Sequence, residues 1–187
     1  ASRPDRSWHA AALTGLAAIG DETAREQLRT ILADDRHPLV AEAAEAAGLA
    51  ADAELLVPLA TLIQSRNGRI ARSSLVALRR FLTGVRSLPG GLTDVPADDV
   101  DHDPAPAADI PLETRAAIED GIASIAVDTY VESGLRHEAL TVARLLGGEG
   151  YRQLLSDLAD QAELEGSRLL AEVQSERRRL RGVDESP

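Results

Sequence analysis

A helical pattern that recurs every 31 residues limits the possible folds of this chain more than any other feature. The three copies are WHAAALTGLAAIG at 8–20, LVAEAAEAAGLAA at 39–51 and IARSSLVALRRFL at 70–82. In each copy, aligned small or apolar residues fall at i, i+1 and i+4, which is one stripe of an α-helix. In the second copy these residues are Ala43, Ala44 and Ala47. The sequence therefore predicts a set of related helices along its first half.

The segments between these helices repeat with the same period. Asp21 aligns with Asp52, and Leu28 aligns with Leu59, so both helices of a two-helix unit recur. A period of roughly 20 to 50 residues built from helix pairs is typical of a solenoid, in which each pair buries its apolar face by stacking on the next. The alternative is a general helical bundle in which the spacing of alanine and leucine coincides by chance.

The second helix of each unit follows an acidic turn and has a sequence of the Ala-Ala-x-x-Leu-Gly type. This pattern resembles the short HEAT-like repeats named after phycobilisome lyases. The resemblance covers Ser7 to Leu82 and returns in a weaker form at 137–160, which reads HEALTVARLLGGEGYRQLLSDLAD. It implies a right-handed α-solenoid of short helix pairs, and it implies binding surfaces and not a catalytic residue set.

Composition also favours an all-α fold, because Ala, Leu, Arg and Glu have high intrinsic helix propensity. The absence of cysteine excludes disulfides and thiolate chemistry. No apolar run approaches the roughly 18 residues that span a bilayer, and the first residues do not form a signal peptide. We therefore expect a soluble, cytoplasmic protein without a membrane partner.

The patterns divide the chain into four segments. Residues 1–83 carry the HEAT-like repeats, 84–111 form an acidic, proline-rich insertion, 112–148 hold a degenerate helical repeat, and 149–187 form a C-terminal capping helix with a polar tail. The composition of the insertion cannot offset the entropy of ordering it, so we expect a disordered, mobile linker, with a binding loop as the alternative. The C-terminal helix either caps the open end of the solenoid or projects to bind a partner.

Positive charge is concentrated in one stretch of an otherwise acidic chain. The whole chain has a net charge of −11, yet residues 55–93 contain six arginines and no carboxylate. On the third repeated helix, the arginines that can reach solvent are Arg69, Arg72, Arg79 and Arg80. They are candidates to bind an acidic protein segment, a phosphate or a nucleic-acid backbone. Alternatively they form a solvated helix face, with their charge offset by the aspartates of 94–109.

The N-terminal helix suggests assembly with another chain. The helix that carries Trp8 has the sequence of a second helix in a pair, yet only seven residues precede it. Without a preceding helix, its apolar flank would face water. We therefore expect either a longer natural protein or another subunit over this face, as in a homo-oligomer or a complex. Trp8 is thus a candidate partner-binding residue.

The sequence offers little for catalysis. The four histidines, at positions 9, 37, 102 and 137, lack the spacing of a metal site, and DDVDHD at 98–103 lacks the spaced acceptors of a calcium loop. We expect no catalytic residues, no metal and no cofactor. The predicted function is a non-catalytic protein-interaction scaffold or adaptor. One alternative is a nucleic-acid or phosphate-binding module that uses the Arg66–Arg86 basic patch, and another, by analogy of fold, is a lyase-like or glycosylase-like enzyme.

Overall fold

The computed structural model describes residues 12, 15, 21–50, 52–84 and 110–165, and this part of the chain contains helices joined by turns, with no strand. The all-α prediction is confirmed. The helices are α2 (Glu22–Leu32), α3 (Val40–Ala50), a 3-10 turn η1 (Ala53–Leu55) that leads into α4 (Leu56–Ile63), α5 (Gly68–Thr83), α6 (Leu112–Val127), α7 (Ser133–Leu146) and α8 (Gly148–Glu165).

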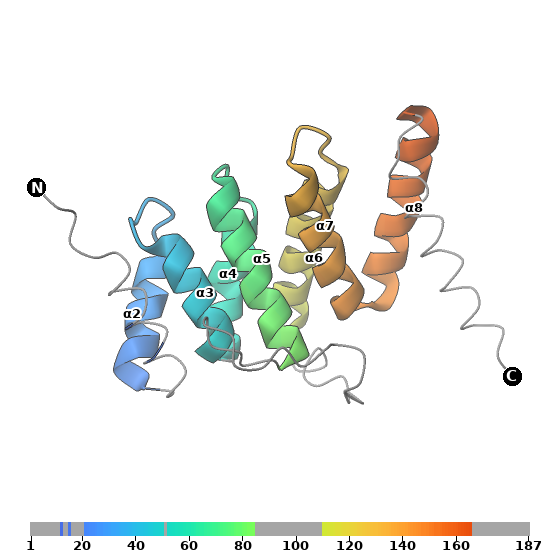
Figure 1. The fold of residues 1–187 in the computed structure, drawn as a ribbon. Coiled ribbons are helices and arrows are strands. Elements are labelled where there is room, and N and C mark those ends of the chain that lie inside the picture. Colours follow the sequence, from blue (N-terminus) through green and yellow to red (C-terminus); the bar gives the residue numbers. More distant parts are fainter. Residues whose placement is uncertain (1–11, 13–14, 16–20, 51, 85–109, 166–187) are drawn as a thin grey trace, which may run out of the picture.

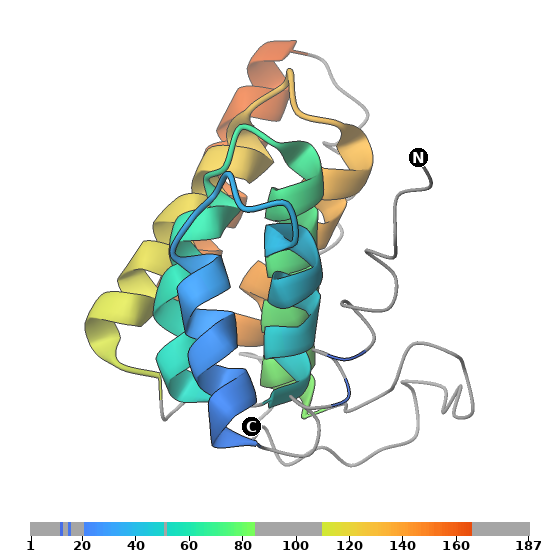
Figure 2. The same ribbon diagram turned by 90° about the vertical axis from the view of Figure 1, so that its left-hand side faces the viewer.

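The helices lie in two rows. Figure 1 shows them following one another along the molecule from α2 to α8, and Figure 2 views the array from the α2 end. One row consists of α2, α4, α6 and α8, and the other consists of α3, α5 and α7, with neighbours in contact along each row. Consecutive helices also pack across the rows as the pairs α2–α3, α4–α5 and α6–α7. The core runs continuously between the two rows.

Residues one period apart have equivalent places in the first two described pairs. The Asp21 carboxylate accepts a hydrogen bond from the Ala24 amide at 2.9 Å and caps α2, whereas Asp52 accepts one from the Glu54 amide at 3.0 Å and begins η1. Such N-caps satisfy amides that have no partner inside the helix. Leu28 and Leu59, which also align, are both buried in the core. The repeat in the sequence is thus also a repeat of caps and core positions.

The contact between α3 and α5 is very close. Ala43, Ala44 and Ala47 on α3 are at most 2% exposed, and Gly48 lies against the backbone of Ala77 on α5. A Cβ atom built on Gly48 would lie 2.6 Å from the Ala77 Cα and 2.8 Å from its carbonyl oxygen. The small residues of the second repeat therefore set the distance between the two helices.

The structure describes the helices on either side of the predicted insertion. Helix α5 ends at Thr83 and is followed by Gly84, whose left-handed backbone (φ 65°) suits glycine, and α6 begins at Leu112. Ile110, which the prediction assigned to the solvated insertion, is only 7% exposed and belongs to the core, because its apolar side chain packs where α6 begins. Residues 85–109 of the predicted mobile insertion and 166–187 of the predicted tail lie outside the described residues.

Arg115 on α6 joins the third pair to α8. Its Nη2 atom donates hydrogen bonds to the carbonyl oxygens of Leu146 (3.0 Å) and Gly147 (3.2 Å), and its Nε atom donates to Glu119 at 2.9 Å. These carbonyls lie at the C-terminus of α7, where helix carbonyls lack partners and a cation is favourable. The guanidinium therefore caps α7 and holds the turn into α8.

Replacing Arg115 with methionine should lower the free energy of unfolding by about 1–2 kcal/mol. The hydrogen bonds from the charged guanidinium to the partly buried carbonyls of Leu146 and Gly147 are lost, whereas methionine keeps an apolar side chain of similar length. Equilibrium urea unfolding measures the change. The matched control is Arg152→Met on α8, since Arg152 pairs with Glu149 in an exposed i,i+3 contact and with no other described residue. The control should change stability by less than about 0.5 kcal/mol, and equal losses in both variants would refute the capping role.

Candidate interaction surface

The four candidate arginines all lie on α5, the central helix of the row that contains α3 and α7. The side chains of Arg69, Arg72 and Arg79 are 62%, 47% and 44% exposed. Arg80 is half-buried. The structure therefore brings these arginines together on one helix, between two neighbouring helices.

On the α3 side, α5 is held by two glutamates. Arg69 Nη2 lies 2.7 Å from Glu42 Oε1, and the Glu42 side chain is only 14% exposed. Ser73 donates its hydroxyl to Glu45 Oε1 at 3.0 Å, and Arg80 Nη1 donates to the main-chain oxygen of Glu45 at 3.4 Å. The contact of Arg69 with Glu42 is a charge-assisted hydrogen bond, which is shorter and stronger than one between neutral groups. These contacts fix α5 against α3.

On the α7 side, the other two arginines have glutamate partners. Arg72 Nη2 lies 3.0 Å from Glu132, which directly precedes α7. Arg79 Nε lies 3.0 Å from Glu138 Oε1, and the Glu138 side chain is 18% exposed. The arginines of α5 thus pair in both directions along the row.

The result is a surface of mixed charge, which we call the α3–α5–α7 surface. It consists of Glu42, Glu45, Arg69, Arg72, Arg79, Arg80, Glu132 and Glu138. The sequence interpretation named the arginines and missed the glutamates, and it sought their counter-charges in 94–109, a stretch outside the described residues. The repeat in the sequence could have indicated these glutamates, because it places the second helices of the neighbouring units, α3 and α7, beside α5, and both carry acidic residues.

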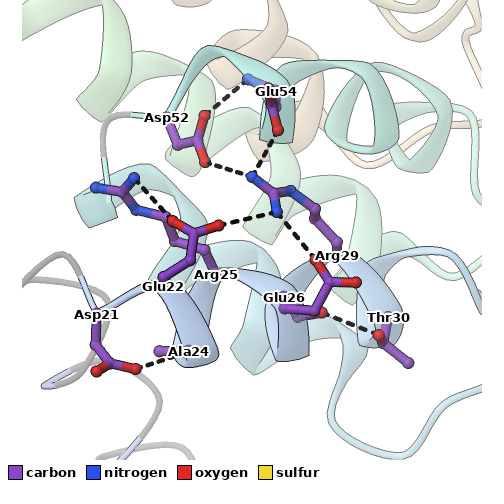
Figure 3. Close-up of polar contacts among 9 residues, drawn as sticks. All are labelled: Asp21, Glu22, Ala24, Arg25, Glu26, Arg29, Thr30, Asp52 and Glu54. Atoms are coloured by element: carbon purple, nitrogen blue, oxygen red, sulfur yellow. Dashed lines mark hydrogen bonds and ion pairs between the residues drawn. The ribbon is translucent and has the colours of Figure 1, made fainter.

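A second charged cluster ties the first pair to the second in the other row (Figure 3). Arg29 on α2 forms ion pairs with Glu26 at 3.0 Å and Glu22 at 3.4 Å on its own helix, and with Glu54 at 2.5 Å and Asp52 at 3.4 Å beside η1. The hydrogen bond to Glu26 contributes most to raising the pKa of Arg29, and Glu54, Glu22 and Asp52 add to this against the lowering effect of desolvation. Arg29 thus remains cationic and links α2 to the start of the next pair.

Some of the predicted features lie outside the described residues. Trp8 and Arg86, and with them the N-terminal face expected to meet another subunit, fall outside. Across residues 21–50, 52–84 and 110–160, no group of three or more His, Asp or Glu side chains is arranged to hold a metal ion. In the same part of the chain, no helix combines the length and the apolar character needed to cross a membrane.

Arginines and glutamates of three neighbouring helices thus form one continuous surface at the centre of the array. Comparisons of the chain with protein-family models, with curated proteins and with solved structures find no match.

Proposed function

We propose that this chain is a non-catalytic protein-interaction scaffold, built as an α-solenoid of short HEAT-like helix pairs. The equivalent caps and core positions of α2–α3 and α4–α5 support the repeat architecture, as does the order of the pairs along the array. In such arrays each pair contacts only its neighbours, and the extended surface along one row is available to a partner.

The observation that carries the proposal is the charge balance of the α3–α5–α7 surface. Arg69, Arg72 and Arg79 each have a carboxylate within 3.0 Å. Nucleic-acid affinity comes largely from cations that are free to neutralise phosphates, and the paired glutamates would repel a polyanion. A protein surface can instead offer both signs of charge in a complementary order, which favours specificity. A protein partner therefore fits this surface better than a nucleic acid.

Affinity purification tests the proposal. The tagged full chain is incubated with an extract of the cells from which it comes, divided in two, and washed with or without nuclease before mass spectrometry. We expect a protein in stoichiometric amount that remains after nuclease treatment and after washing at moderate salt. Recovery only of nucleic acid, or of proteins that nuclease releases, would favour the nucleic-acid alternative and contradict the scaffold.

A further inference from the structure

The only asparagine of the chain, Asn67, directly precedes Gly68, where the turn after α4 meets the start of α5. Both residues are exposed, and nothing lies within 4 Å of a Cβ atom built on Gly68. In an Asn-Gly pair, the main-chain nitrogen of the glycine can attack the side-chain carbonyl carbon of the asparagine. A side chain on the second residue hinders this attack, and glycine has none. The pair is therefore sterically open to deamidation.

The structure folds the Asn67 side chain over the peptide bond to Gly68. Asn67 Oδ1 accepts a hydrogen bond from the Arg69 amide at 3.1 Å, and the Asn67 amide donates to the Ser65 hydroxyl at 3.3 Å. The ring that the first of these bonds closes contains both Asn67 Cγ and the Gly68 nitrogen, because the side chain replaces one arm of a β-turn. The two reacting atoms are thus held near each other.

The surroundings stabilise the charge that the attack creates. Negative charge develops on Asn67 Oδ1, and the Arg69 amide already donates to this atom. Donors that are in place where charge develops lower the barrier of such a reaction. The Gly68 amide has no acceptor among the described residues and lies at the N-terminus of α5, where the helix dipole favours its deprotonated form. Arg66 adds a positive charge directly before Asn67.

We infer that Asn67 is a modification site, at which the folded chain deamidates without an enzyme. The Gly68 nitrogen loses its proton and bonds to Asn67 Cγ, the bond from Cγ to Nδ2 breaks, and ammonia leaves, which gives a succinimide. Water then opens the ring. Cleavage between the nitrogen and Cγ gives aspartate, and cleavage between the nitrogen and the main-chain carbonyl carbon gives isoaspartate. Water is the only co-reactant.

Both products place a new carboxylate at the end of α5 that carries Arg69. Aspartate caps a helix as well as asparagine does, and its charge is favourable at a helix N-terminus, so this product keeps the fold. Isoaspartate lengthens the main chain by a carbon atom, which displaces the cap of α5. In either case the α3–α5–α7 surface becomes more acidic at this end. The inference does not depend on the proposed function, because the reaction needs no partner.

Peptide mapping by mass spectrometry tests the inference. The purified full chain is incubated at neutral pH, and circular dichroism shows that it remains folded. We expect the peptide that contains Asn67 to gain the mass that results when NH2 is replaced by OH, and electron-transfer fragmentation should identify both aspartate and isoaspartate. Gly68→Ala should slow the reaction several-fold, because the added methyl group hinders the attack. This variant keeps the fold, since its Cβ meets no neighbour.

Two controls make the result decisive. Asn67→Ser keeps a capping side chain but has no carboxamide, so this peptide should not change in mass. A synthetic peptide of residues 62–72 shows how fast the same sequence reacts without the fold. An unchanged mass in the folded chain, under conditions in which the synthetic peptide reacts, would show that the cap protects Asn67 and would overturn the inference. Equal rates in the wild-type and Gly68→Ala chains would also overturn it, because the attack by the Gly68 nitrogen would be wrong.

Discussion

Replacing Gly48 with alanine is expected to destabilise the folded chain by about 3 kcal/mol, because the added methyl group collides with the backbone of the neighbouring helix. The new Cβ would lie 2.6 Å from the Ala77 Cα and 2.8 Å from its carbonyl oxygen. Neither atom can rotate away, since both belong to the main chain of α5. Relief therefore requires α3 and α5 to separate, which loosens the contacts made by Ala44 and Ala47. Equilibrium urea unfolding measures the loss.

The control for Gly48→Ala is Gly68→Ala, in the first turn of α5. Nothing lies within 4 Å of a Cβ built there, and Gly68 does not have a positive φ. Alanine also restricts the unfolded chain more than glycine does. This variant should be neutral or more stable by up to about 1 kcal/mol. If Gly48→Ala also left the free energy of unfolding unchanged or raised it, α3 and α5 would not pack as closely as described.

The second large effect is a gain of nucleic-acid binding when the glutamates are neutralised. Glu42→Gln, Glu132→Gln and Glu138→Gln together remove the carboxylates from Arg69, Arg72 and Arg79 while keeping the size of each side chain. The freed arginines can then neutralise phosphates. At about 50 mM salt, three additional phosphate contacts should raise the affinity for a single-stranded oligonucleotide by roughly two orders of magnitude. Fluorescence anisotropy measures the affinity, which should fall steeply as salt is raised.

The control is a second triple variant with the same net charge as the first, because removing any three carboxylates also weakens the repulsion between the acidic chain and the oligonucleotide. Glu113→Gln, Asp120→Asn and Asp160→Asn remove three exposed carboxylates from α6 and α8, which belong to the other row. This variant should bind the oligonucleotide almost as weakly as the wild type, because no arginine of α5 loses its partner. Equal gains in both triple variants would show that net charge, and not pairing, limits binding.

The all-α content could be predicted because its cause is local and periodic. Leu28 and Leu59 align in the sequence and are both buried, and Asp21 and Asp52 align and cap α2 and the 3-10 turn η1. Apolar spacing and capping residues act within a few residues of each other, so the sequence displays them directly. Ile110 was misassigned because proline and aspartate before it outweighed its own apolar side chain.

The pairing of the arginines could not be predicted in the same way. Arg69 meets Glu42 and Arg79 meets Glu138 across helix contacts whose register depends on how closely the helices approach. Between α3 and α5, that approach depends in turn on Gly48 against Ala77, a contact that no single-sequence pattern displays.

In the proposed scaffold, neighbouring helices hold the arginines of α5, and a mixed-charge surface remains for a protein partner. A double-mutant cycle on Arg79 and Glu138 measures how firmly one of these arginines is held, with Arg79→Gln, Glu138→Gln and the double variant compared by urea unfolding. Since the Glu138 side chain is only 18% exposed, we expect a coupling energy of about 1 kcal/mol. Additive single effects, with coupling below about 0.3 kcal/mol, would mean that Arg79 is free to bind a ligand, contrary to the proposed function.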